Sequence, residues 1–302
     1  MRERKGMVNR QTLATETTLE GIGLHTGVRV RIRLVPANAE TGIVFVRTDA
    51  GSVTVPADLD WAGPCHYATV LRKDGVTVST IEHLMAALYA LQVDDVRVEL
   101  DGPEVPILDG SSLPFVEAIL EAGRKELEVP RQYLTVVRPV ELTHEEKTIA
   151  VFPCPEYRVT YAIGFDHPLL GYQELTASLW GTEAFAEKLA PARTFVLERE
   201  VEALRSMGLA KGGSLENAVV LGETGVLNSG LRFSDEFVRH KMLDLTGDLS
   251  LLGRPLRGHV IAYRAGHDLH GRLARRIRQR RDSWHLAPWT EEAPPQKAAT
   301  PA

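Results

Sequence analysis

Between residues 81 and 100 the spacing of apolar residues changes from that of a helix to that of a strand. The first part carries four apolar side chains on one helical face: Ile81, Leu84, Leu88 and Leu91. The second part alternates, with charged residues separating Val96, Val98 and Leu100. A period of 3.6 predicts an amphipathic helix and a period of 2 predicts a half-buried strand, so a helix leads into a strand here.

Further helices and strands follow with the same two periods. The DGSSLPF stretch supplies turn residues and a Ser cap before a helix through Phe115 that ends near Gly123. The polar, Pro-containing stretch RKELEVPRQ then interrupts the pattern. Strand-like alternation resumes over 157–165, and a helix is predicted to begin after Ser234, whose side chain is expected to cap it. Another helix is predicted from Leu269 to Trp284.

Both halves of the chain therefore consist of strands followed by two helices, which predicts an α+β fold. We place a domain boundary near residue 128, within the polar stretch. The expected domains cover 1–128 and 129–290. Residues 291–302 are rich in Pro, Ala and Thr and lack a period, so they predict a disordered tail.

Charge and cysteine content narrow the classes of function. The formal net charge of −5 argues against a general nucleic-acid binder, and the basic run RLARRIRQRR is therefore predicted to be a solvated helix face. No segment has the roughly 20 continuous apolar residues of a membrane-spanning helix, so we expect a cytoplasmic protein. Cys65 and Cys154 stand alone, which leaves His and carboxylate residues as the ligands of any metal ion.

The stretch FVRHKMLDLTGDLSLL carries a polar stripe along its predicted helix. His240, Asp244 and Asp248 recur every four residues, and at about 100° per residue they share one face. Apolar residues form a separate stripe, so the polar stripe need not face solvent. A His and an Asp one turn apart can reach a single cation, although such a pair on a helix surface is commonly only solvated.

A second candidate is STIEHLMAAL, where Glu82 and His83 open the first helix. Adjacent helical side chains point about 100° apart, so His83 can bind a metal ion while Glu82 approaches a water molecule beside it. The alternative is that Glu82 is favoured at a helix start by the helix dipole alone. His83, His240 and Asp244 together form a two-His, one-carboxylate set that suits Zn²⁺, with Fe²⁺ as the substitute. Such a set is typical of a hydrolase, with Glu82 as the general base.

Expulsion of an amine also requires a proton donor, and AYRAGHDLH offers His267. We expect this residue in an exposed loop, where most His side chains are only solvated. As an acid it needs a partner that keeps it protonated, and Asp248 on the polar stripe is the candidate. Weaker signals are His25 in the Gly-rich turn GIGLHTG and Thr194 with Phe195 in ARTF, which alone commonly indicate turns or packing.

These motifs occur in the order found in one family: GIGLHTG, STIEHL, DGSSLPF, FDHP, ARTF, KGGSLENA, FVRHKMLDLTGDL and AGH. From about residue 10 to 288 the chain resembles the UDP-3-O-acyl-N-acetylglucosamine deacetylases, the zinc-dependent enzymes of lipid A biosynthesis. The resemblance implies two similar β-α-α-β domains, each with a small insert. Their helices would pack between two sheets, with the active site at the junction of the domains.

The resemblance also implies a role for individual residues. The catalytic zinc ion would be held by His83, His240 and Asp244, with Glu82 as the base. His267 would be the cationic acid, supported by Asp248, and Thr194 would stabilise the oxyanion. Lys241 and Phe165 would contact the nucleotide, with His25 at the polar end of the cleft. Phe195 and the insert 196–223 would form the wall of an apolar passage for the acyl chain.

Two positions depart from the family pattern. The family commonly reads GHxLN where this chain has His270 in place of Asn, and the Cys65-His66-Tyr67 stretch differs near the expected metal cleft. The first change leaves the catalytic set intact, whereas the second concerns the acyl-chain preference.

The resemblance predicts hydrolysis of the N-acetyl group of UDP-3-O-acyl-N-acetylglucosamine, giving acetate and UDP-3-O-acyl-glucosamine in the committed step of lipid A biosynthesis. The alternative is a non-catalytic homologue that binds the nucleotide sugar without metal-dependent turnover. We expect a monomer that acts on a small acylated UDP-amino-sugar and has no nucleic-acid partner.

Overall fold

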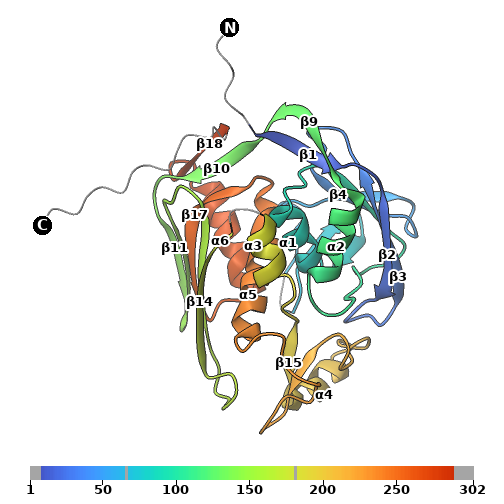
Figure 1. The fold of residues 1–302 in the computed structure, drawn as a ribbon, viewed down its shortest axis with the longest axis vertical. Helices are drawn as coiled ribbons and strands as arrows, with labels where there is room; N and C mark the ends of the chain where they lie inside the picture. Colours follow the sequence, from blue (N-terminus) through green and yellow to red (C-terminus); the bar gives the residue numbers. More distant parts are fainter. Residues whose placement is uncertain (1–7, 65–66, 180–181, 289–302) are drawn as a thin grey trace, which may run out of the picture.

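A computed structural model describes residues 8–64, 67–179 and 182–288 of the chain. Two sheets lie on opposite sides of the molecule and the main helices lie between them (Figure 1). The predicted α+β fold with helices between two sheets is therefore confirmed. No helix within the described residues is long and apolar enough to cross a membrane.

The first sheet has five strands in the order β2-β3-β8-β4-β5. Its central strand is the predicted alternating segment, and its inward residues are buried while its charged residues face outward. The strands are β2 (Thr17–Ile22), β3 (Arg29–Pro36), β4 (Ile43–Arg47), β5 (Val53–Pro56) and β8 (Val96–Leu100). A hairpin of β6 (Val70–Lys73) and β7 (Val76–Ser79) forms a separate two-stranded sheet.

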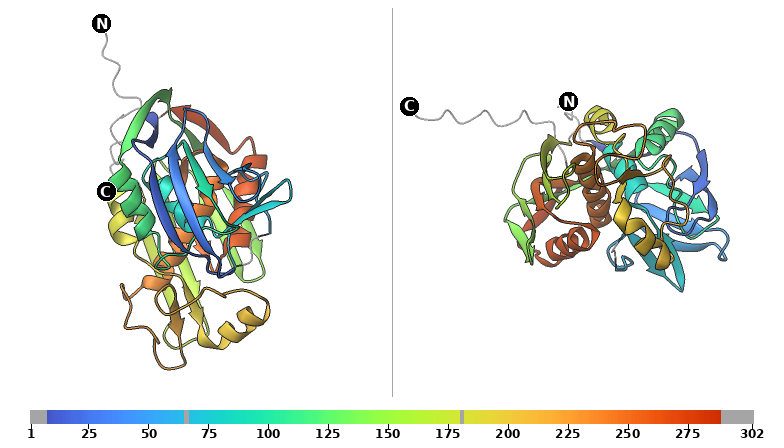
Figure 2. Two further views of the ribbon diagram at one scale, coloured as in Figure 1. Left: turned by 90° about the vertical axis from the view of Figure 1, so that its right-hand side faces the viewer. Right: turned by 90° about the horizontal axis from the view of Figure 1, so that it is seen from below.

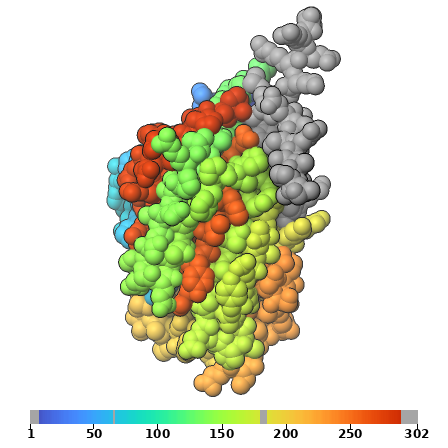
Figure 3. Space-filling view, turned by 90° about the vertical axis from the view of Figure 1, so that its left-hand side faces the viewer, coloured from blue at the N-terminus to red at the C-terminus, as the bar shows by residue number. Residues whose placement is uncertain are grey.

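The second sheet has seven strands and repeats the arrangement of the first. β17 pairs antiparallel with β12 and parallel with β13, as β8 pairs antiparallel with β3 and parallel with β4. Figure 3 shows its outer face, where β17 lies between the strands on either side. The strands are β10 (Gln132–Val136), β11 (Val140–His144), β12 (Lys147–Phe152), β13 (Tyr157–Gly164), β14 (Tyr172–Ser178), β17 (Leu256–Tyr263) and β18 (Trp284–Pro288).

The helices between the sheets follow the same repeat. In each half one helix precedes the central strand and a second helix follows it, so that α1 (Glu82–Ala90) corresponds to α5 (Glu236–Leu249), and α2 (Leu113–Ala122) to α6 (His267–Gln279). α1 packs directly on α5, and α5 packs on α6. The apolar faces of these helices and the inner faces of both sheets form one continuous core.

The second half carries an additional unit that extends from one end of the molecule (Figure 2). This insert consists of β15 (Phe195–Leu197), α4 (Glu198–Ser206) and β16 (Val219–Leu221), with β15 and β16 paired in parallel. A short helix, α3 (Thr182–Lys188), precedes it, and the 3-10 helix η1 (Ser250–Leu252) follows α5.

Three local predictions differ from the structure. The polar stretch near the expected boundary is strand β9 (Arg124–Pro130), which pairs antiparallel with β1 (Asn9–Leu13); β9 itself is largely exposed and therefore needs few apolar residues. The predicted helix 269–284 ends at Gln279, because residues 284–288 form strand β18 against β10. Asp235 rather than Ser234 is the N-cap of α5, and its side chain forms no capping hydrogen bond. The predicted tail, 291–302, lies outside the described residues.

Candidate active site

The site is built where α1 meets the middle of α5. Gly247 on α5 faces the backbone of Glu82 on α1, and a Cβ atom at Gly247 would lie only 2.0 Å from the Glu82 carbonyl oxygen. A side chain at this position would push the helices apart, so glycine permits their close contact. The contact buries the whole polar stripe. His240, Asp244 and Asp248 are each only 1–2% exposed.

Two histidines and one carboxylate converge at this contact. The Nε2 atoms of His83 and His240 lie 3.6 Å and 3.3 Å from Asp244 Oδ1. One ligand atom from each residue falls within 4.8 Å of the others, which satisfies the requirement for a shared cation. Asp244 Oδ1 is buried and makes no hydrogen bond within the described part of the chain, as expected of an oxygen that serves as a metal ligand.

The protonation of the three residues also suits a metal ion. Burial lowers the pKa of His240 to about 3, despite the opposing effect of Asp244, so its imidazole is neutral. Its Nδ1 donates to the Ala192 carbonyl oxygen at 3.1 Å, which leaves Nε2 free as a ligand. Asp244 is buried, but neighbouring His240 and Lys241 hold its pKa well below the usual value, and Lys241 Nζ donates to Asp244 Oδ2 at 2.8 Å.

Glu82 lies beside this cluster and is suited to act as a base. Its side chain is buried, and burial raises the pKa of its carboxyl group although the nearby His267 and His83 oppose this effect. Its Oε2 accepts the backbone N–H of Thr69 at 2.9 Å, which fixes the orientation of the carboxyl group. A carboxylate with a raised pKa accepts a proton near neutral pH more readily than an exposed one.

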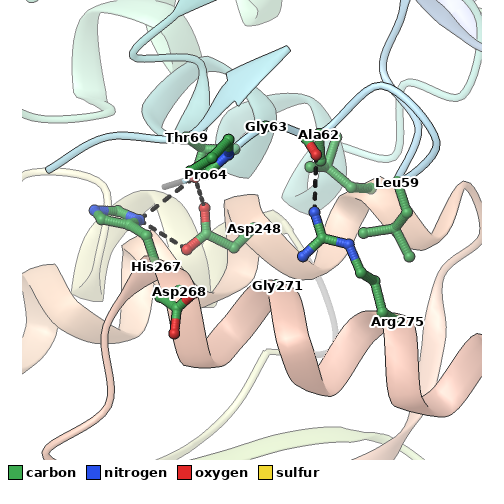
Figure 4. A pocket seen from close by; sticks show the side chains of 11 residues that line it. Leu59, Ala62, Gly63, Pro64, Thr69, Asp248, His267, Asp268, Gly271 and Arg275 are labelled. Carbon is green, nitrogen blue, oxygen red and sulfur yellow. Dashed lines mark hydrogen bonds and ion pairs between the residues drawn. The ribbon is translucent and has the colours of Figure 1, made fainter. Parts of the chain in front are cut away.

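His267 occupies a different place from the one predicted. It is the first residue of α6 and only 8% exposed, because α6 packs its N-terminus against α5, so the expected exposed loop is wrong. Its Nδ1 donates to Asp248 Oδ2 at 2.8 Å, as Figure 4 shows. Burial lowers the pKa of His267, but the carboxylates of Asp248 and Asp244 outweigh it and raise the pKa to about 9.

This raised pKa predicts a loss of stability in alkali. Because it exceeds the ordinary value of 6.5, protonated His267 stabilises the fold fully below pH 6.5, and this stabilisation is lost as the pH rises to about 9. We expect the melting temperature of metal-free protein to fall over this range in the wild type and to fall less in His267→Gln. The exposed His144→Gln variant should follow the wild type. Parallel profiles for the wild type and His267→Gln would contradict the assignment.

Three of the remaining predicted residues line an apolar cavity of about 400 Å³ between the first half and the insert. His25, Thr194 and Phe195 line it, as do Tyr67, Val201 and Leu204. The Phe195 ring lies 6.0 Å from that of Phe165 and 6.3 Å from that of His240, so the cavity begins beside the metal-ligand cluster. Cys65 and His66 lie outside the described residues, and Tyr67 is half exposed at the cavity wall.

Sequence reasoning missed several residues of the site. Thr69 contacts both Glu82 and Asp248, and His270 donates to the same Asp248 oxygen as His267. The buried Arg193–Glu236 ion pair ties the segment before Thr194 to the start of α5. Only His270 carried a signal in the sequence, since it departs from the family pattern one turn after His267.

Comparison with known proteins agrees with this geometry. The family model of UDP-3-O-acyl N-acetylglycosamine deacetylase matches residues 10–279. The chain belongs to this family. Among named UDP-3-O-acyl-N-acetylglucosamine deacetylases, that of Syntrophotalea carbinolica is 47% identical over 95% of this chain and 93% of its own. That of Myxococcus xanthus is 46% identical over 94% and 91%, and that of Nautilia profundicola is 44% identical over 89% and 92%.

Membership in this deacetylase family matches the chemistry of the buried cluster. A two-His, one-carboxylate set beside a carboxyl group with a raised pKa and a cationic imidazole suits metal-assisted hydrolysis. Since the match extends over both halves of the chain, it includes every element that contributes to the cluster: α1, α5 and the start of α6.

Proposed function

We propose that this protein is a zinc-dependent deacetylase that hydrolyses the N-acetyl group of UDP-3-O-acyl-N-acetylglucosamine, the committed step of lipid A biosynthesis. The observation that carries the proposal is the buried set of His83, His240 and Asp244, with Glu82 adjacent to His83 in the chain and His267 Nε2 3.9 Å from Asp244 Oδ2. The names of relatives at 44–47% identity support the choice of substrate.

His83, His240 and Asp244 would hold the metal ion. One carboxylate and two imidazoles suit Zn²⁺, and Fe²⁺ accepts the same ligands. When bound, the ion would polarise the acetyl carbonyl group and make a nearby water molecule easier to deprotonate. The hydrogen bond from His240 to Ala192 and that from Lys241 to Asp244 support the set by orienting two of its ligands.

The protein's own side chains move the protons. Glu82 takes a proton from the attacking water, which adds to the acetyl carbonyl carbon. The C–N bond then breaks, and His267 donates a proton to the departing amine. The pKa of His267, raised to about 9 by the neighbouring carboxylates, keeps this donor charged at neutral pH. The hydroxyl group of Thr194 is assigned to the developing oxyanion.

The substrate would extend in two directions from this centre. Lys241 and the half-exposed Phe165 would contact the nucleotide portion, with His25 at the polar end of the cleft. The fatty acyl chain would enter the cavity beside Phe195, with the insert 196–223 as one of its walls. Burial of a methylene group contributes roughly 0.8 kcal/mol, so the fit of this cavity selects chain length.

The proposal also concerns the domain organisation of the chain and the compartment in which the enzyme acts. The two halves, 1–128 and 129–290, would act as domains that meet at the site, and α1 and α5 would join them. We place the enzyme in the cytoplasm as a monomer, with a small-molecule substrate and no nucleic-acid partner. The free Cys154 agrees with a reducing compartment.

The test is acetate release from UDP-3-O-acyl-N-acetylglucosamine by zinc-loaded protein, beside chelator-treated protein and the Glu82→Ala variant. We expect release that requires both the metal ion and Glu82. The substrate should be offered with several acyl lengths, so that a chain-length mismatch is not mistaken for inactivity. Folded, zinc-containing protein that binds the nucleotide sugar without releasing acetate would favour the non-catalytic homologue instead.

A further inference from the structure

Asp248 receives more hydrogen bonds than its role beside His267 requires. One oxygen, Oδ2, accepts from His267 Nδ1 at 2.8 Å and from His270 Nδ1 at 2.7 Å. The other oxygen, Oδ1, accepts from the hydroxyl group of Thr69. All four side chains are almost completely buried. An ionised carboxylate only accepts, so three donors from three directions fix both of its oxygens.

The two additional donors come from different parts of the fold. Thr69 precedes β6 in the first half, and its backbone N–H also donates to Glu82 Oε2. His270 lies one turn after His267 on α6 and is fully buried. The Nε2 atom of His270 lies 3.0 Å from the hydroxyl oxygen of Tyr161, which in turn donates to the Ala265 carbonyl oxygen at 2.7 Å. Tyr161 of β13 therefore holds the His270 ring on the side of its Nε2 atom.

These buried side chains also border a cavity. Thr69, Asp248 and His267 are almost completely buried but contribute to the lining of a cavity of about 320 Å³, whose lining residues Figure 4 shows. Where packing is incomplete, a fully satisfied hydrogen-bond network restrains the rotamers of its members. Hydrogen bonds from Thr69 and His270 supply that restraint on Asp248.

We propose that Thr69 and His270 are positioning residues that fix Asp248 from both halves of the protein and thereby aim His267 at the leaving amine. Neither residue is assigned contact with substrate or metal. Thr69 also fixes Glu82 through its backbone, so one residue sets the spacing between the proton acceptor and the proton donor. The inference rests on the proposed function, since it concerns the donor of that reaction.

Thr69 provides a matched pair of variants. Thr69→Val preserves the shape and the backbone bond to Glu82 but removes the hydroxyl group, whereas Thr69→Ser keeps that group. Loss of a hydrogen-bonding partner that orients a metal ligand typically costs roughly 10–100-fold in activity, and we expect a similar factor for a partner that orients Asp248. We expect Thr69→Val to lower kcat by about this factor with KM and zinc content unchanged, and Thr69→Ser to recover most of the loss. Wild-type kcat in folded Thr69→Val would overturn the assignment of Thr69.

His270 provides an independent pair if Thr69→Val does not fold. His270→Asn keeps a donor at about the position of Nδ1, and His270→Leu removes it. We expect kcat of the Asn variant to lie near that of the wild type and that of the Leu variant to fall about ten-fold. Equal kcat in both would overturn the role of His270.

A spectroscopic readout separates failure of this inference from failure of the proposed function. NMR of ¹⁵N-histidine-labelled protein reports the hydrogen-bonded Nδ1 proton of His267 without any turnover. We expect this signal to broaden or shift in Thr69→Val and His270→Leu but not in Thr69→Ser. Inactive wild type would refute the proposed reaction, whereas active wild type with unchanged signal and kcat in the variants would refute only the positioning role.

Discussion

Replacement of Glu82 by Gln is expected to lower kcat for acetate release by roughly 10²–10⁴-fold, the usual contribution of a general base. Glutamine has nearly the same shape and can still accept the N–H of Thr69, so the local structure should persist. It cannot take a proton from water. Since Glu82 is not one of the three candidate metal ligands, zinc content should stay at the wild-type level.

The control for this variant is Glu117→Gln, the same chemical change at an exposed position on α2. It should leave kcat, KM and melting temperature unchanged. Initial rates of acetate release, with metal content measured on the same samples, distinguish loss of the base from loss of the ion. If Glu82→Gln retained more than about a tenth of the wild-type kcat, another group would have to be the base.

Replacement of Glu236 by Ala is expected to lower the free energy of unfolding by about 3–5 kcal/mol, the cost of leaving a buried charge without its partner. Glu236 is fully buried and its Oε1 accepts from Arg193 Nε at 2.8 Å and from the Arg193 backbone N–H at 3.0 Å. Burial alone would raise the pKa of Glu236, but the hydrogen bonds from Arg193 and Arg232 lower it. The carboxylate is therefore charged in the folded protein.

The neighbouring ion pair gives a matched control. Asp235 and Arg239 pair on the same helix but remain partly exposed, so Asp235→Ala should cost no more than about 1 kcal/mol. Urea unfolding of both variants gives the comparison. The double variant Arg193→Met with Glu236→Leu should regain part of the loss, because it removes both buried charges. Equal costs for Glu236→Ala and Asp235→Ala would show that burial does not govern this pair.

The Arg193–Glu236 pair also has a functional consequence. Arg193 directly precedes Thr194, and Glu236 begins the helix that carries His240 and Asp244. The pair therefore fixes the oxyanion candidate relative to the two candidate metal ligands on α5. Any folded fraction of Glu236→Ala should show reduced kcat as well as reduced stability.

The amino-acid sequence by itself determined the features that depend on nearby residues. The periods around Leu84 and Val98 predicted α1 and β8, and the four-residue spacing of His240, Asp244 and Asp248 predicted one face of α5. Local periodicity is visible because side-chain direction within one element follows from the backbone geometry alone. The ordered motifs then identified the family, and the family model confirmed it.

Only the tertiary structure decided which distant residues meet. The contact at Gly247 brings α1 onto α5, and the partner of Asp248 in the first half, Thr69, lies 179 residues away in the chain. The polar ribbon strand β9 and the final strand β18 were likewise missed. Strands that bury little apolar surface show no clear alternation of apolar and polar residues. A hydrogen bond between distant residues produces no periodic pattern in the sequence, because the bond depends on how the whole chain packs.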